Sequence, residues 1–227
     1  MNINTDFESG QVLLIDKPYK WTSFDVVKKL RNQLKVKKIG HAGTLDPLAT
    51  GLLVLCTGKF TKRIESFQAQ EKEYVCRMLL GKSTPSFDLE TPFDCEYDIS
   101  AITESMIKAN LVNFLGTQWQ IPPVFSAVKV NGVRSYEKAR RGEDVAVRPR
   151  SIFIRELEIT DISLPEITFR LVCSKGTYVR SLVRDFAKAL GTGGCMLDLR
   201  RTRIGGFNVA SAYKPEDFIK IVKNEII

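Results

Sequence analysis

The chain alternates between short apolar runs and segments with a helical period. The apolar runs predict buried strands at VLLID, which ends at the Lys17–Pro18 pair, at LLVLC (52–56) and at EYVCRMLL (73–80). SIFIRELEI and ITFRLVC are predicted to form a pair of strands on either side of a turn at Pro165. Strand pairs joined by short turns are typical of antiparallel sheets.

Apolar residues three and four positions apart predict helices. The expected helices begin at Thr22 or Ser23, at about Thr103, at Val179 and at Pro215. The apolar face expected for the first is formed by Phe24, Val27, Leu30 and Leu34. A short helix is expected at SYEKARRG, and residues 82–100 are predicted to form a surface loop. Because strands and helices mix without strict alternation, we predict an α+β fold with a mixed, mostly antiparallel central sheet, flanked by helices and loops, in a single domain of residues 1–227.

The charge pattern indicates a polyanionic partner. The chain is 44% apolar and 26% charged, as in ordinary globular proteins, with a net charge of +8. Its basic residues gather in runs, namely Lys35, Lys37 and Lys38; Arg140 and Arg141; Arg148 and Arg150; and Arg200, Arg201 and Arg203. Several such runs in one basic chain favour nucleic acid as the partner.

Other function classes find no support in the sequence. The five widely spaced cysteines and single histidine predict reduced, buried or inert thiols rather than a zinc site. A phosphate-binding loop fails at both candidate positions, since Cys76 replaces a required glycine and Phe60 replaces a required Ser or Thr. Apolar runs are too short to span a membrane and the first residues are polar. We therefore expect a cytoplasmic protein without a metal or nucleotide cofactor.

The segment GHAGTLDPLATGLL (40–53) holds the only histidine, His41, together with Asp46. An Asp-Pro pair beside glycines is by itself typical of an ordinary turn ahead of a strand. The whole string, however, resembles the catalytic motif of the TruB family of tRNA pseudouridine synthases.

Five further motifs of the same family occur in order along the chain, one before this segment and four after it. They are LLIDKP (13–18), KEYVCRMLLG (72–81), QIPPVFSAVKVNG (120–132), CSKGTYVRSLVRDFAKALG (173–191) and LRRTRIG (199–205). On these motifs the chain is identified as a member of the family, whose reaction isomerises uridine in RNA without redox change, energy input or metal.

The resemblance implies a role for each of seven residues. Asp46 is the expected nucleophile, which attacks either the ribose or the base, and Arg180 is its expected counterion. Tyr74 is expected to stack on the target uracil. The expected substrate-binding residues are His41, which lies near the flipped nucleotide, Tyr178 and Leu199, which line its pocket, and Lys17, which supports the loop.

The family also implies the substrate, which is the T-loop uridine at position 55 of tRNA. We expect the chain to bind the T-arm stem-loop as a monomer, without an obligate protein partner and without a C-terminal PUA domain. Two alternatives remain at this point. Dyskerin-type relatives share the motif but act on guided RNA targets, and an RNA chaperone would bind RNA without needing Asp46.

Overall fold

The computed structural model describes residues 6–126, 129–130, 132–135, 141, 143 and 146–223. The helix expected at SYEKARRG lies outside the described residues, apart from Ser135 and Arg141. The described chain forms two compact units, one of Met1–Tyr74 with Leu199–Ile227 and one of Val75–Asp198. The boundaries fall inside the long strands β4 (Lys72–Leu80) and β12 (Gly194–Ile204), so each of these strands contributes to both units.

The first unit is built on part of a mixed sheet. Its other strands are β1 (Val12–Lys17), β2 (Ile39–His41), β3 (Thr50–Thr57) and β13 (Phe207–Asn208). The order is β1-β3-β12, with β2 paired to β3 and β13 paired to β12. β1 and β2 run antiparallel to β3, whereas β12 runs parallel to it and places Arg201 opposite Gly51. β3 is almost wholly buried because helices cover both of its faces.

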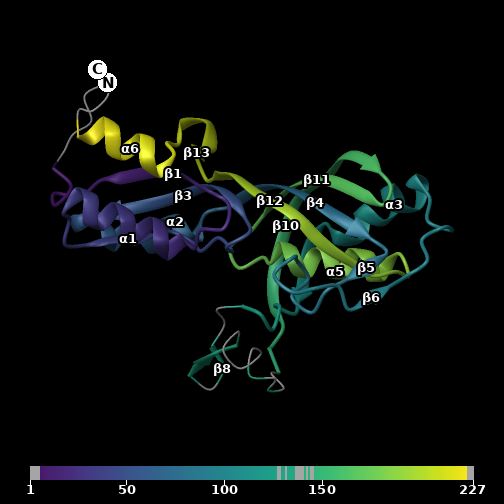
Figure 1. Cartoon of the computed structure of the whole chain (residues 1–227). Coiled ribbons are helices and arrows are strands. Elements are labelled where there is room, and N and C mark those ends of the chain that lie inside the picture. The colour runs from purple at the N-terminus through teal and green to yellow at the C-terminus, as the bar shows by residue number, and fades with distance from the viewer. Residues whose placement is uncertain are drawn as a thin grey trace. The chain divides into compact units, whose positions relative to one another are not determined.

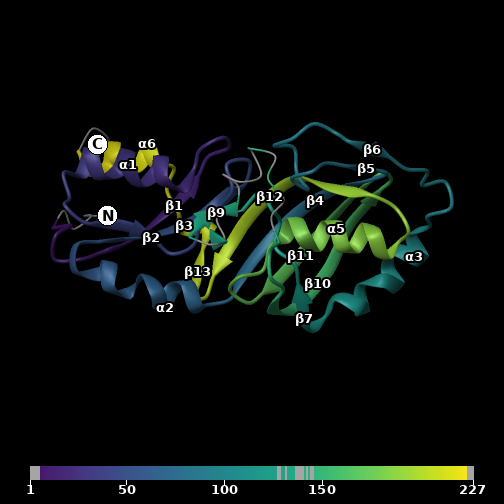
Figure 2. The same cartoon turned by 90° about the horizontal axis from the view of Figure 1, so that it is seen from below.

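Helices α1 (Ser23–Leu34) and α6 (Pro215–Val222) lie on one side of this sheet and α2 (Ile64–Ala69) on the other (Figures 1 and 2). Thr22 begins α1 as predicted, with its hydroxyl accepting from the backbone of Asp25 in a capping box. Val26, Val27 and Leu30 face the core. The prediction for Phe24 was wrong, because its side chain is 61% exposed.

The second unit carries strands in the order β12-β4-β11-β10-β7. The added strands are β7 (Gly116–Gln120), β10 (Arg150–Ser163) and β11 (Glu166–Cys173). β10 and β11 form the predicted antiparallel pair on either side of Leu164–Pro165. Helix α5 (Val179–Ala189) packs near α3 (Glu104–Asn110), since Phe186 contacts Phe114 directly after α3, at 5.3 Å between ring centroids (Figure 1).

The predicted fold class is confirmed: the structure is α+β, with a mixed sheet that is mostly antiparallel. Residues 82–100 form more than the predicted loop, because β5 (Lys82–Ser83) pairs with β6 (Cys95–Glu96) and three polar residues, Thr84, Ser86 and Asp88, are buried. The single-domain expectation stays a prediction. None of the helices in the described part of the chain is long and apolar enough to cross a membrane.

Candidate active site

Asp46 lies in the loop between β2 and β3, here called the Asp46 loop (residues 42–49), and its side chain is half-buried. The loop closes on itself, since the Ala49 backbone N–H donates to the Asp46 carbonyl at 3.1 Å. The buried Ser23 hydroxyl of α1 holds Leu45, the residue before Asp46. It accepts from the Leu45 N–H at 2.9 Å and donates to the Leu45 carbonyl at 3.2 Å. Gly43, with φ 108°, supplies backbone geometry that other residues rarely adopt.

Lys17 is completely buried at the end of β1, beneath the same loop. Its Nζ donates to the carbonyls of Trp21 at 2.5 Å, Pro18 at 3.0 Å and Pro47 at 3.2 Å. Burial lowers the pKa of Lys17 to about 8, against the opposing effect of the Asp46 carboxylate. The sequence assigned this lysine to loop support, and the structure ties it to the residue directly after Asp46.

The other predicted residues of the first unit are largely enclosed by protein. Tyr74 on β4 is 8% exposed and Leu199 on β12 is 7% exposed. His41 ends β2, where burial lowers the pKa of its imidazole and the nearby Arg201 charge lowers it further. A lowered pKa favours the neutral imidazole, so His41 is suited to hydrogen bonding and to packing against a base rather than to phosphate binding.

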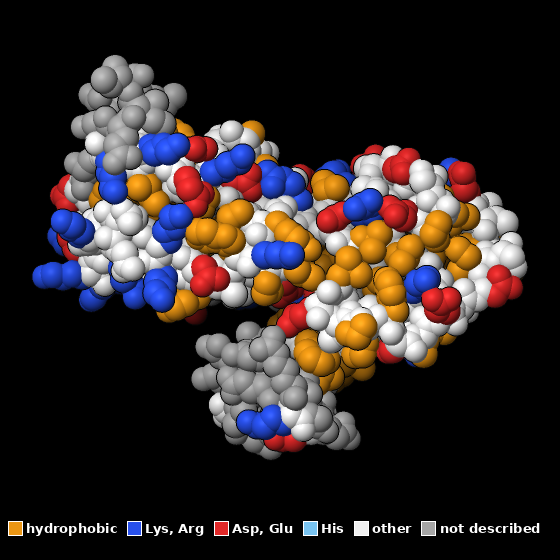
Figure 3. Space-filling view, viewed as in Figure 1, with side chains coloured by type: hydrophobic (Ala, Val, Ile, Leu, Met, Phe, Trp, Pro, Cys, Tyr) orange, Lys and Arg blue, Asp and Glu red, His pale blue; other side chains and the backbone are white. Residues whose placement is uncertain are grey.

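The basic run at residues 200–203 is only partly available to a polyanion. Arg201 is 1% exposed, Arg200 pairs with Asp16 at 2.7 Å, and Arg203 pairs with Glu73 at 3.7 Å. Charge counting misses this because it carries no information on burial. Lys35, Lys37 and Lys38 are exposed as expected, and Figure 3 shows Lys and Arg side chains gathered over the part of the first unit that holds α1 and α6.

In the second unit, Arg180 lies in the first turn of α5 and is 3% exposed. Its guanidinium donates to the carbonyls of Ser86 at 3.2 Å and Phe125 at 3.0 Å. Its Nε is 3.5 Å from the carboxylate of Asp88, which is 1% exposed. Sequence reasoning missed Asp88 because it sits in a segment that looked like a surface loop. A buried pair of this kind holds the arginine in one orientation.

Tyr178 is the N-cap residue of α5, two positions before Arg180. The buried side-chain amide of Gln120 accepts from its N–H at 2.8 Å and donates to its carbonyl at 3.1 Å. The Arg150 guanidinium lies 5.3 Å from the centre of the Tyr178 ring. Gln120 was not predicted as a site residue, although it opens the QIPPVFSAVKVNG motif.

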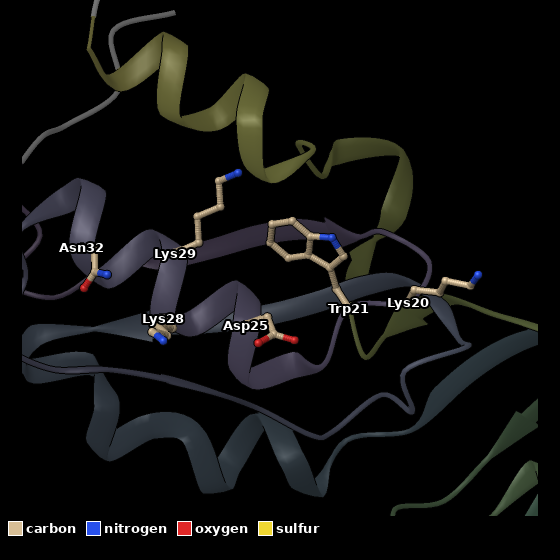
Figure 4. A pocket seen from close by; sticks show the side chains of 6 residues that line it. All are labelled: Lys20, Trp21, Asp25, Lys28, Lys29 and Asn32. Atoms are coloured by element: carbon tan, nitrogen blue, oxygen red, sulfur yellow. The ribbon is translucent and has the colours of Figure 1, made fainter. Parts of the chain in front are cut away.

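A separate pocket of about 420 Å³ adjoins the N-terminal half of α1. It is lined by Lys20, Trp21, Asp25, Lys28, Lys29 and Asn32. Figure 4 shows that the three lysines point in different directions, and Lys29 is engaged by Glu216 at 2.6 Å. The polar groups do not converge on one point, so the Asp46 loop is the better candidate for chemistry.

Neither a metal-ligand cluster in the described part of the chain nor the thiols of Cys56 and Cys195 offer a second candidate for the catalytic site. Within the described ranges, no group of three or more His, Cys, Asp or Glu side chains could hold a metal ion. Burial raises the pKa of Cys56 and of Cys195 to about 11, which makes both thiols unreactive. All five cysteines are free, and Cys95 alone among them is exposed.

Two family models match almost the whole chain. The N-terminal domain model of the TruB family of pseudouridylate synthases matches residues 31–179, and the C-terminal domain model of tRNA pseudouridylate synthase B matches residues 180–225. The tRNA pseudouridine synthase B of Parabacteroides distasonis is 50% identical over 228 residues, with 98% of this chain and 97% of the relative covered. The protein of the same name from Flavobacterium johnsoniae is 53% identical, with 91% and 93% covered.

Solved structures give the same picture at lower identity. The chain is similar to a protein in a Cbf5-Nop10-Gar1 complex, with a TM-score of 0.74, 29% identity and 97% of this chain covered. It is also similar to a protein in an H/ACA RNP bound to a substrate RNA containing 2′-deoxyuridine, with a TM-score of 0.72 and 26% identity. The chain spans 58% and 57% of those two chains, which is less than two thirds of their length.

Proposed function

Since the chain belongs to the TruB family of pseudouridylate synthases, we propose that it isomerises a uridine of tRNA to pseudouridine, with Asp46 as the nucleophile and the T-loop uridine at position 55 as the target. The relatives that share about half of its residues over nearly their full length are named for this activity on tRNA. A monomer that acts in the cytoplasm without an obligate protein partner stays our expectation.

The setting of Asp46 is the observation that carries the proposal. It is the only ionisable residue of its loop, and the loop is held from below by buried Lys17 and from the side by buried Ser23. A solvated turn ahead of a strand would not need a buried cation at 0% exposure beneath it. A loop restrained in this way can present a carboxylate in one direction to a bound nucleotide.

The reaction exchanges one glycosidic bond for another. The bond from ribose to the uracil nitrogen breaks, the uracil turns, and a bond from ribose to a ring carbon forms. That carbon loses its proton and the released nitrogen takes one up, so the reaction has no net redox change. The Asp46 carboxylate can add to the ribose or to the base, and the proposal covers both routes.

The remaining roles follow the family assignment. The target uridine must leave the stack, at a cost of a few kcal/mol, before it can meet the carboxylate. We propose that His41 fills the space it leaves and that Tyr178 and Leu199 line the pocket that receives it. Tyr74 stacks on the uracil and assists the removal of the ring-carbon proton.

Asp46 must stay ionised while RNA covers it. Covering the carboxylate removes water and by itself favours the protonated form, so cations are needed to offset this effect. We propose that Arg180 provides the counterion in the complex with RNA. Lys17 contributes from within the first unit, where its charge and that of Asp46 interact.

The function is tested by pseudouridine formation on a T-arm transcript. Release of tritium from uridine labelled at the ring carbon should report turnover on both the T-arm hairpin and whole tRNA. A hairpin with cytidine at position 55 is the matched control and should release none. Binding of the hairpin without any pseudouridine, at enzyme in excess over RNA, would contradict the proposal and favour an RNA chaperone.

The lowered pKa of Lys17 leads us to expect that the reaction rate falls at alkaline pH. Its pKa of about 8 lies below the ordinary value of 10.5, so the folded protein loses this proton as the pH rises through 8. The neutral amine has no charge to offer Asp46 and one N–H fewer for the three carbonyls, so the loop loosens. We expect kcat/KM on the hairpin to fall above pH 8 in the native enzyme.

The variant Lys17→Met separates this effect from other titrations. It has no amine to titrate, so its kcat/KM should be low throughout and should lack the limb near pH 8. Circular dichroism across the same range should confirm that both proteins stay folded. An identical alkaline limb in Lys17→Met would assign the titration to another group.

A further inference from the structure

Arg201 is the largest fully buried side chain of the first unit that has no assigned role in the reaction. It lies on β12, opposite Gly51 of β3 in the parallel pair. Its neighbours Arg200 and Arg203 have carboxylate partners, Asp16 and Glu73. Among the residues that the structure describes, the guanidinium of Arg201 is bound by carbonyl oxygens alone.

Those carbonyls lie on both sides of Asp46. The Arg201 Nη2 donates to the Gly43 carbonyl at 3.1 Å and Nη1 to the Thr44 carbonyl at 3.4 Å, at the start of the loop. Its Nε donates to the Leu52 carbonyl at 2.8 Å, in the strand that follows. One rigid, planar group therefore fixes the separation between the two ends of the segment that carries Asp46.

The backbone of Arg201 also fits this segment closely. A Cβ on Gly51 would lie 2.3 Å from the Arg201 carbonyl oxygen and 2.8 Å from its backbone nitrogen. Gly51 has φ 103°, so a side chain there would be strained as well. The backbones of β12 and β3 are thus in direct contact at Arg201 and Gly51. This contact restricts any shift of β12 along β3, so the position of the guanidinium relative to the loop is restricted as well.

A buried guanidinium held only by neutral groups is costly unless an anion lies within reach of its field. The charge of Arg201 lowers the pKa of His41, which precedes the loop, and the pKa of Lys17, which binds the Pro47 carbonyl within it. Lys17 in turn interacts with the Asp46 carboxylate. Asp46 is the only acid of residues 40–53, and of the two acids that act on Lys17 it has a larger effect than Asp25.

We propose that Arg201 is a positioning residue for the reaction: its guanidinium ties the start of the Asp46 loop to β3, and its charge favours the ionised carboxylate of Asp46. This inference rests on the proposed function of Asp46. It differs from a purely structural role, which would stabilise the fold without affecting the ionisation of the nucleophile.

Three variants test the two parts of the proposal. Arg201→Met removes the charge and the hydrogen bonds, whereas Arg201→Lys keeps the charge but loses the planar fork. Arg203→Met is the matched control, because it removes a positive charge two residues further along the same face of β12, away from the loop. Where Arg201→Met does not fold, Arg201→Gln replaces it, since its amide NH2 can still donate hydrogen bonds but carries no charge.

The first readout is the acid limb of kcat/KM on the T-arm hairpin, which reports the pKa of the essential acid in the unbound enzyme. We expect this limb to move up by about one pH unit or more in Arg201→Met, and to stay in place in Arg201→Lys and Arg203→Met. Both Arg201 variants should lose kcat by about a hundredfold, near 2.7 kcal/mol, with a nearly unchanged KM.

The second readout is amide hydrogen exchange of residues 42–52 in the protein without RNA. It should accelerate in both Arg201 variants and not in Arg203→Met. An acid limb that stays in place in the neutral variant, or loop exchange that stays at the native rate, would overturn the proposal. Failure of the proposed function would look different, since Asp46→Asn would then remain active whatever Arg201 does.

Discussion

Replacing Asp46 with asparagine should abolish pseudouridine formation while leaving the fold and the affinity for RNA intact. The amide has the shape of the carboxylate and fits the same half-buried position, but it cannot act as a nucleophile. We expect a loss of at least about 10⁴-fold in the single-turnover rate, equivalent to about 5.4 kcal/mol of transition-state stabilisation. Tritium release at saturating enzyme measures this rate without interference from product release.

Asp217→Asn is the matched control for the loss of one negative charge from the first unit. Asp217 is exposed in the first turn of α6, away from the Asp46 loop, so its replacement should leave the rate within about twofold of the native value. Hairpin affinity, measured by fluorescence anisotropy, should be the same for all three proteins. Turnover by Asp46→Asn within tenfold of the native rate would remove Asp46 from the role of nucleophile.

Replacing Arg180 with methionine should reduce both activity and stability. The activity falls because Asp46 loses its proposed counterion, and we expect a decrease of roughly 10³-fold, near 4 kcal/mol. The stability falls because the carboxylate of Asp88, which is 1% exposed, then has lost its cation. Leaving one partner of a buried ion pair unpaired typically costs about 3–5 kcal/mol of unfolding free energy.

The double variant Arg180→Met/Asp88→Asn separates these two effects. It removes the unpaired buried charge, so the free energy of unfolding in urea should recover most of the loss, whereas the single-turnover rate should not recover. Asp88→Asn alone should keep Arg180 but lower the rate through poorer orientation. If the double variant regained native activity, Arg180 would matter only for the stability of the second unit.

Local patterns were enough to predict the elements that surround the site. VLLID and LLVLC became β1 and β3, because short apolar runs indicate buried strands. The periodic stretch beginning at Val179 became α5, because burial on one face leaves a period that short windows detect. The direction that α1 faces was less accessible. The buried face of α1 includes Val26 rather than Phe24, because the helix packs against strands and against α6, which lies far away in sequence.

The motif located the Asp46 loop but not what holds it. Arg201 appeared as one member of a basic run, because the charge of a residue says nothing about its burial. Asp88 appeared in a polar surface loop, and its pairing with Arg180 joins segments far apart in the chain. Ser23 was noted only as a possible helix cap, whereas its hydroxyl binds the backbone of Leu45. Such supports depend on tertiary contacts that no local pattern records.

The division of the chain has a consequence for its synthesis. The first unit combines Met1–Tyr74 with Leu199–Ile227, so the ribosome completes the whole of Val75–Asp198 before it adds Arg200 and Arg201, the residues of β12 that pair with β3. Chains emerge at about 5–20 residues per second, which leaves the Asp46 loop without the hydrogen bonds of Arg201 for seconds after the loop is made. A nascent or prematurely terminated chain therefore carries Asp46 without Arg201, and the loop gains the hydrogen bonds of this guanidinium only near the end of synthesis.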